Sequence, residues 1–534
     1  MKRLISLVLV LFLFAGIFSS CSSDDPVVLF FAMDSAAGSF DPQIVSDATA
    51  GVVVRNCFEG LLRKDENGDI VNGVAKSYSV SSDGLTYTFQ LREDAVWHLT
   101  SNAQKQLEGK LPEDFSLSVT AYDFEFALKR AVSPETKAPL SYMLYNIVNA
   151  PEILSGEKDK HELGVEAVGK YTLKITLSAP QNNFEEVLCE SICMPCNETF
   201  FNACAGRYGT LIKFLLSNGP FYLSRFDESS YRINKASDYI GESVAVPDYV
   251  WLYVVEDEAK LRDVLEKDTY SGAVVSEDVY SSMKLDADKT VIETPNIIKG
   301  LIMNLSDAVT GEENIRKALA AATDTEAVAA SAGKQHALSI VPLSAAEKGI
   351  GTHPEPFSEE KAVVYLKNGM EKLEKTSIDI ALLCEKRYED AMKRLVQEWQ
   401  RILGIYVNFT VKTGTAAEVR RAVDSGNYQI AFCDYTAQTD SAYEYFGTFT
   451  ASSPYNITGY DGFGMEELLA KLHSGDRDNY NSVYASIESK LSAASVLLPV
   501  WSESSYFVMT ENVRDVLFFS GSDKLYFHKA TNVR

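Results

Sequence analysis

Four cysteines fall close together before the middle of the chain. The segment CESICMPC, residues 189–196, spaces Cys189, Cys193 and Cys196 as C-x₃-C-x₂-C, and Cys204 follows shortly after. Cysteine thiolates hold iron–sulfur clusters and zinc, and in an oxidising compartment they form disulfides instead. Iron–sulfur clusters are assembled in the cytosol, and the radical enzymes that use them work there. Whether these cysteines hold a metal cluster or form disulfides therefore depends on the side of the membrane on which they lie.

The N-terminus has the layout of a secretory signal. Lys2 and Arg3 precede an almost unbroken apolar run from Leu4 to Phe18, which is too short to span a bilayer comfortably. Small residues then lead to Cys21, as in the lipobox of bacterial lipoproteins, in which signal peptidase II cuts before a cysteine that carries a diacylglycerol. We expect residues 1–20 to be a signal peptide and Cys21 to anchor the mature chain at the extracytoplasmic face of the bacterial cell membrane. The alternative is an ordinary secreted protein with a cysteine near its cleavage site.

An extracytoplasmic location disfavours a metal cluster at the four cysteines. Apolar residues between Phe184 and Ile192 recur at roughly helical spacing, with Cys189 and Cys193 near the same stripe. Since free cysteine packs as a small core hydrophobe, we expect buried thiols or one disulfide, with the pairing left open. Apart from Cys21, seven of the eight cysteines remain, so at least one is free or paired outside the chain.

Composition favours an exported globular protein with a large core. The chain has 534 residues, 46% of them hydrophobic, and a formal net charge of −24, which becomes −26 once Lys2 and Arg3 leave with the signal peptide. This charge argues against nucleic acid, and against anionic lipid, as a partner of the folded body. The six histidines lack zinc-protease spacing, and nucleotide-binding and G-x-S-x-G motifs are absent, so we expect no catalytic residues, metal site or cofactor.

Hydrophobic periodicity predicts a mixed α/β fold. The predicted elements are strands at 27–34, 86–91, 171–177 and 249–255, helices at 47–62, 121–132 and 313–323, and hairpin turns at Asn67-Gly68 and Asp83-Gly84. From Ile378 the order IDIALL, EDAMKRLVQEWQRILG, IYVNFTV, AAEVRRAVDSG, YQIAFCDY is strand, helix, strand, helix, strand. Such an alternation favours a parallel sheet with right-handed crossovers.

Six motifs in order resemble the extracellular solute-binding proteins of peptide and nickel ABC importers, the family 5 group. They are FDPQ with NCFEGLL, GVAKSYSVSSDGLTYTFQLREDAVW, VTAYDFEFALKR, SNGPFYL, ENIRKALAAATD and LLPVW, and they span almost the full mature length. The resemblance implies a two-lobed α/β fold of the periplasmic-binding-protein type II, cluster C, with an extra subdomain in lobe I. The implied ranges are 21–60, 186–290 and 499–534 for the lobe I core, 61–185 for the extra subdomain and 291–498 for lobe II.

The function implied by this resemblance is that of a lipid-anchored receptor. It would capture oligopeptides between its lobes by hinge closure and deliver them to the permease subunits of an ABC transporter. Its partners would be a short peptide, the permease and, through Cys21, the membrane; we expect a monomer that binds no nucleic acid. The alternatives are another ligand on the same fold, such as a nickel chelate, haem or an oligosaccharide, and more remotely a surface enzyme or sensor.

The resemblance also points to eight ligand-facing residues. They are Ser46, Asp47 and Ala48 after FDPQ, Tyr435, Gln438 and Asp440 in lobe II, and Trp501 and Glu503 near the second hinge. Two structural alternatives stay open: Asp47 could cap the helix that begins there, and Tyr435 and Trp501 could be core aromatics.

Two departures from the family pattern concern loops. The loop after Trp97 is altered and lengthened. Relatives that bind free peptides carry (D/A)-D-Y-x-x-P, whose aspartate receives the peptide's α-ammonium, and an alignment of CDYTAQTDSAYEYF places Gln438 there with Asp440 two residues on. Because a glutamine cannot pair with an ammonium as a carboxylate does, either Asp440 substitutes or the ligand has no free amine at that point.

Overall fold

A computed structural model places most of the mature chain. It describes residues 26–532 apart from 34, 46, 182–183, 228, 287–288, 338, 341–355, 437–445, 451–455, 457, 459–463, 472–479 and 520–523. Among the helices within these ranges, none has the length and apolarity to cross a membrane.

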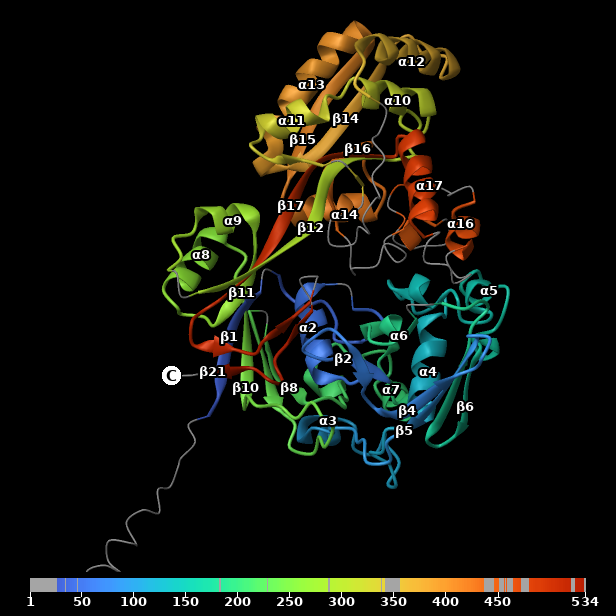
Figure 1. Ribbon diagram of the computed structural model, residues 1–534, viewed down its shortest axis with the longest axis vertical. Helices are drawn as coiled ribbons and strands as arrows, with labels where there is room; N and C mark the ends of the chain where they lie inside the picture. Colours follow the sequence, from blue (N-terminus) through green and yellow to red (C-terminus); the bar gives the residue numbers. More distant parts are fainter. Residues whose placement is uncertain are drawn as a thin grey trace, which may run out of the picture.

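Two lobes stand one above the other, and a single sheet runs through both (Figure 1). Its strand order is β15-β14-β16-β12-β17-β11-β1-β10-β9-β8, with β13 paired to β17 off this path. The strands are β1 (Val28–Met33), β8 (Phe221–Asp227), β9 (Ser230–Lys235), β10 (Tyr249–Val254), β11 (Gly272–Ser276), β12 (Thr290–Met303), β13 (Gln335–His336), β14 (Ile378–Glu385), β15 (Val407–Gly414), β16 (Ile430–Thr436) and β17 (Leu497–Met509).

Strands β12 and β17 pass from one lobe to the other. Their lower halves pair antiparallel from Thr290–Met509 to Thr294–Ser505, and the pairing resumes at Ile297–Glu503 after a register shift. In the lower half β17 also pairs with β11, and in the upper half β12 pairs with β16. The irregularity therefore marks where the two lobes join. The lobe boundaries predicted from the sequence stay a prediction.

Lobe II contains the predicted strand–helix run. Helix α13 (Glu389–Leu403) connects β14 to β15, helix α14 (Ala416–Asp424) connects β15 to β16, and both strand pairs, β14 with β15 and β14 with β16, are parallel. The buried face of α13 includes Leu395 and Trp399, which join a cluster with strand residues such as Leu382. The predicted parallel α/β sheet is confirmed.

Lobe I adds a four-stranded antiparallel sheet to its half of the long sheet. Its order is β4-β5-β7-β6, from β4 (Ala75–Val80), β5 (Thr86–Leu91), β6 (Val165–Gly169) and β7 (Thr172–Thr176). Helix α4 (Ala121–Ala131) packs against β6 and β7, and it begins with a capping box between Thr120 and Asp123. Gly68 and Gly84 have φ of +83° and +72°, so the predicted hairpin turns are confirmed.

The first long helix is shorter than predicted. Helix α2 spans Ala48–Cys57, and the chain turns extended at Phe58, whose φ and ψ are −121° and 154°. The side chain of Asn218 explains this end, because it accepts from the N–H of Glu59 and donates to its carbonyl oxygen. A partner distant in sequence thus ends the helix before its apolar pattern does.

The remaining elements are short connections and outer helices. They are β2 (Leu62–Lys64), β3 (Ile70–Asn72), α3 (Ser101–Gln106), α5 (Ala150–Leu154), α6 (Phe184–Val187), α7 (Glu198–Ala203), α8 (Glu258–Glu266), α9 (Glu277–Ser282), α10 (Glu313–Ala321), α11 (Thr325–Ser331), α12 (Glu359–Lys372), α16 (Met465–Lys471), α17 (Tyr480–Ala493), β18 (Val513–Arg514), β19 (Leu517–Phe518), β20 (Leu525–Tyr526) and β21 (Thr531–Asn532).

Candidate functional site

The parallel strands of lobe II end beside the crossing strands. Ligands of open α/β sheets bind beyond the carboxyl ends of such strands. Strand β14 ends at Glu385 and is followed by Arg387 and Tyr388, and Asp434 lies near the end of β16. These residues meet β12 and β17 where the two lobes join, so this region is the candidate site.

A buried lysine is the centre of the site. Lys299 on β12 is 3% exposed, and its Nζ lies 3.6 Å from Glu385 Oε1 and 3.7 Å from Asp434 Oδ1, over the ring of Tyr388. Burial opposes the charge of Lys299, but the neighbouring carboxylates outweigh it and raise the pKa of this lysine. Lys299 in turn lowers the pKa of Asp434, so the site holds an ionised carboxylate whose side chain is 44% exposed.

Two cations of lobe II contact acids of lobe I. Lys334 Nζ, just after α11, lies 2.6 Å from Asp278 Oδ1 and 3.4 Å from Glu277 Oε2, both on α9. Arg387 reaches Glu258 on α8 at 3.5 Å and Asp278 at 3.8 Å. Helix α8 precedes β11 in the chain and helix α9 follows it, and both helices lie beside this strand in lobe I (Figure 1). These ion pairs therefore join the lobes beside the crossing strands.

The sequence-predicted residues of β16 and β17 are buried beside this cluster. Trp501 is 0% exposed, packs on Phe432 and Tyr388, and donates from Nε1 to Glu503 Oε1 at 2.9 Å. Glu503 also lies 3.3 Å from Lys334 Nζ. Tyr435 is 5% exposed and pairs across the sheet with residue 298 of β12.

Two predicted residues of lobe I begin helix α2. Asp47 is the N-cap, and its side chain accepts from the N–H of Ala50 at 2.8 Å and from the N–H of Gly38 at 2.9 Å. Ala48 is the first residue of the helix. Capping, the structural alternative for Asp47, is therefore present.

The structure thus joins Trp501 to Glu503, with Tyr435 two strands away, and places Asp47 and Ala48 apart from them in lobe I. Cys21, Ser46, Gln438 and Asp440 lie outside the described residues. A role in ligand binding stays a prediction for all eight site residues.

The loop before α2 is held by a buried polar network. The guanidinium of Arg130 on α4 donates to both carboxylate oxygens of Asp41, at 2.7 and 2.5 Å, and to the side-chain oxygen of Gln43. Gln43 Nε2 donates in turn to the carbonyls of Ile192 at 3.2 Å and Met194 at 2.8 Å. Two of the sequence motifs, FDPQ and VTAYDFEFALKR, therefore meet at one ion pair, and the cysteine segment supports both.

The cysteine segment is part of the packed interior beside this network. Seven cysteines of the described ranges, at 57, 189, 193, 196, 204, 384 and 433, are buried, and no group of His, Cys, Asp or Glu within these ranges could hold a metal ion. Burial raises the pKa of Cys189 and of Cys196 to about 12. The segment holds buried thiols, the first of the two expected arrangements.

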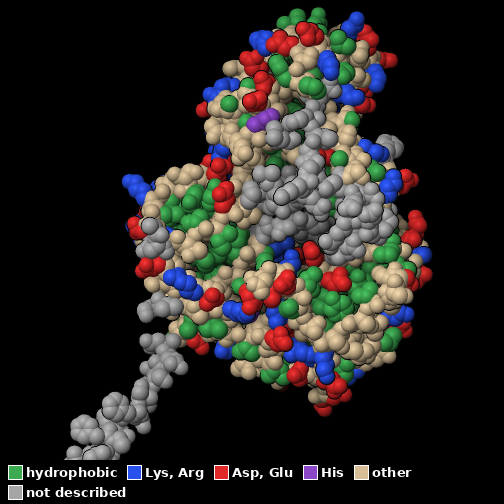
Figure 2. Space-filling model, viewed as in Figure 1, with side chains coloured by type: hydrophobic (Ala, Val, Ile, Leu, Met, Phe, Trp, Pro, Cys, Tyr) green, Lys and Arg blue, Asp and Glu red, His purple; other side chains and the backbone are tan. Residues whose placement is uncertain are grey.

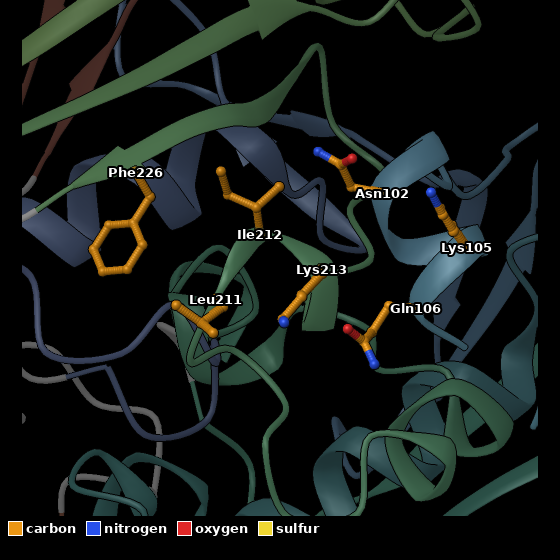
Figure 3. Close-up of a pocket in the computed structure, with 7 residues that line it drawn as sticks. All are labelled: Asn102, Lys105, Gln106, Leu211, Ile212, Lys213 and Phe226. Carbon is orange, nitrogen blue, oxygen red and sulfur yellow. The ribbon is translucent and has the colours of Figure 1, made fainter. Parts of the chain in front are cut away.

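A separate cavity of about 520 Å³ opens on lobe I (Figure 3). It lies between α3, on the lengthened loop after Trp97, and the segment around Lys213, with Phe226 of β8 at its far side. None of the described site residues lines it.

Acidic and basic side chains are interspersed over the visible face of the molecule (Figure 2), so on this face the net negative charge does not form one continuous patch.

Sequence reasoning missed the charged cluster. Lys299 stands inside the apolar run NIIKGLIM, and Glu385 ends the apolar strand IDIALLCE. A charge inside a buried strand needs a partner, which is the signal that could have pointed to both residues. The identity of the partners could not be read, because they come from distant parts of the chain.

Comparisons with known proteins agree with this architecture. The family model described as "Bacterial extracellular solute-binding proteins, family 5 Middle" matches residues 69–456. The oligopeptide-binding protein OppA of Bacillus subtilis is 24% identical, and the match covers 99% of this chain and 99% of that protein. The dipeptide-binding protein DppE of the same organism is 25% identical over 92% of this chain and 89% of its own.

Among solved structures, Listeria monocytogenes OppA bound to peptide superposes with a TM-score of 0.80. The two sequences are 20% identical, and the superposition covers 96% of this chain and 100% of the other. The expected two-lobed type II α/β fold is therefore confirmed.

Proposed function

This chain belongs to family 5 of the bacterial extracellular solute-binding proteins, and from that premise we propose that it is a lipid-anchored receptor for oligopeptides. It captures a peptide between its lobes by closure and delivers it to the permease of an ABC transporter. The observation that carries the proposal is the full-length match to an oligopeptide-binding protein, together with a site at the junction of two lobes.

An extended peptide is the ligand that we propose for this site. Backbone hydrogen bonds to strand edges contribute about 0.5–1.5 kcal/mol each and need no side-chain recognition. Charged groups near the ends of β14 and β16 would fix the orientation of the peptide. Asp434 and Arg387 are partly exposed, at 44% and 36% of their side chains, and can receive an ammonium and a carboxylate respectively.

We assign the peptide's α-ammonium to Asp434. Asp434 and Tyr435 can be matched to the D-Y of the family motif directly, which is an alternative register to the alignment through Gln438. Asp434 is ionised, because Lys299 lowers its pKa, and it lies near the carboxyl end of β16. This assignment requires a ligand with a free amine.

Calorimetry with a library of short peptides tests the proposal. We expect heat from several peptides. N-acetylation of a bound peptide should weaken binding by about 10- to 100-fold, the equivalent of a hydrogen bond to a charged group. The loss should disappear in Asp434→Asn and persist in the control Asp379→Asn, since the exposed Asp379 carboxylate of β14 binds Asn408 instead.

Three outcomes would contradict the proposal or one of its parts. No heat from any peptide, with no ligand retained in native mass spectrometry, would rule out a peptide receptor. A penalty for acetylation that Asp434→Asn leaves unchanged and Asp440→Asn removes would return the ammonium to Asp440. Intact mass of the membrane-extracted protein tests the anchor, because an unmodified Cys21 would rule it out.

A further inference from the structure

The loop between β9 and β10, residues 236–248, exposes three aliphatic side chains. Ile240, Val244 and Val246 are 58%, 49% and 44% exposed, and Ala245 between them is buried. Exposed aliphatic residues are ordinary singly, but a concentration of three on one loop calls for an explanation.

The loop lies where the N-terminal strand enters the fold. Strand β1 runs parallel to β10, with Val28 opposite Tyr249. Just before this register, the Val27 N–H donates to the Asp248 side chain and the Asp248 N–H donates to the Val27 carbonyl, both at 2.9 Å. β1 enters at the end of lobe I that faces away from lobe II (Figure 1). The loop and the start of the strand therefore share one end of the molecule.

The sequence between Cys21 and Val27 is short. Ser22–Pro26 contains five residues, and a fully extended chain advances at most about 3.6 Å per residue. An acylated Cys21 would therefore hold Val27 within about 20 Å of the membrane surface. The loop bonded to Val27 is kept within the same short reach.

The loop is also held in place. The Tyr239 hydroxyl donates to Glu59 Oε1 at 2.7 Å, and Arg92 binds the other oxygen of Glu59 at 2.9 Å. The Val246 N–H donates to the carbonyl of His528 at 2.7 Å. Because both sides of the loop are fixed, little conformational entropy would be lost when its apolar side chains leave water.

The acids of the loop have partners. Glu242 binds Arg63 at 3.0 Å, and Asp238 lies 2.8 Å from His98 Nδ1. Repulsion between this loop and a membrane surface is therefore reduced, in spite of the net charge of the whole chain.

We propose that Ile240, Val244 and Val246 insert into the interfacial layer of the membrane that anchors the protein. This inference rests on the lipid anchor of the proposed function. The loop then gives the tethered body a second point of contact and fixes its orientation, with lobe II outermost. The contact is apolar, so it requires no anionic lipid, and added salt leaves it unchanged.

Quenching by brominated acyl chains tests this contact in the lipidated protein. Val244→Trp, reconstituted in phosphatidylcholine vesicles, should gain fluorescence that brominated lipid quenches. The matched control is Val364→Trp: Val364 is 57% exposed on α12, at the outer end of lobe II, and a tryptophan there should stay unquenched (Figure 1). Equal quenching in both variants, or none in either, would overturn the proposal.

Vesicle partitioning of the Cys21→Ser protein gives a second measure. Each half-exposed aliphatic side chain adds about 5-fold to partitioning, so replacing all three by serine should reduce it by about 100-fold. Val364→Ser should change nothing. Unaltered partitioning of the triple variant, or partitioning that vanishes in high salt, would overturn the proposal. Peptide calorimetry on the same variants and the intact mass of Cys21 report on the proposed function independently.

Discussion

The ion pairs between α9 and lobe II should stabilise the arrangement of lobes in this structure. Replacing both acids of α9, Glu277→Gln with Asp278→Asn, removes three contacts to lobe II. Two of them join Lys334 at 3.4 and 2.6 Å, and one joins Arg387 at 3.8 Å. These carboxylates are 33% and 43% exposed, so each contact contributes about 0.2–1 kcal/mol, and the total is about 1–2 kcal/mol.

This choice of residues leaves the buried charges paired. Lys334 keeps Glu503 at 3.3 Å, and Arg387 keeps Glu385 at 2.8 Å. Replacing Lys334 itself would leave Glu503, which is 6% exposed, without its closest cation and would destabilise the fold for a different reason. The double variant therefore acts on the junction of the lobes and leaves the core of lobe II intact.

Calorimetry and small-angle scattering measure the effect. We expect peptide affinity to fall about 5- to 30-fold, which corresponds to 1–2 kcal/mol, and the peptide-free protein to become more extended. The difference should shrink in high salt, because partly exposed pairs are screened. The control is Glu389→Gln, which breaks pairs of the same type with Lys386 and Lys393 inside lobe II. Equal affinity of wild type and double variant, or an equal loss in the control, would refute the reasoning.

Two further predictions concern stability. Arg130→Met should lower the free energy of unfolding by about 3–5 kcal/mol in denaturant titrations, because it leaves the buried Asp41 without its cation. The control Arg401→Met removes an exposed pair with Glu359 and should lower the free energy of unfolding by less than about 1 kcal/mol. A similar loss in both variants would contradict the role of burial. Although burial opposes it, the field of Arg55 and Lys524 lowers the pKa of Glu190 from 4.5 to about 2. A carboxyl group whose pKa is lower in the folded state than in the unfolded state stabilises the fold at any pH above its unfolded pKa. This stabilisation is lost as the pH falls towards the folded pKa of about 2. Glu190 should therefore account for a loss of about 3 kcal/mol in the free energy of unfolding between pH 5 and 2. The free energy of unfolding of Glu190→Gln, measured at several pH values in this range, should depend less on pH than that of the wild type. An unchanged pH dependence would exclude the effect.

Elements that depend on near neighbours in the chain could be predicted from the sequence. The turn at Asn67-Gly68 needs a positive φ that glycine supplies, and the period of apolar residues in 389–403 requires a helix with one buried face. The alternation of strands and helices from Ile378 then led to a parallel sheet. The order of motifs along the chain indicated the family.

Only the tertiary structure decided which distant residues meet. The sequence shows a lysine at 299 and an arginine at 130, but their partners Glu385 and Asp41 lie 86 and 89 residues away. The loop beside the N-terminal strand depends in the same way on the Val27–Asp248 bonds, which join residues 221 positions apart. Periodicity and turn chemistry act over a few residues, whereas a buried charge takes whichever partner the packing of the whole sheet brings to it. For this reason the sequence by itself determined the elements and the family, and the folded chain determined the charged junction and the apolar loop at the tethered end.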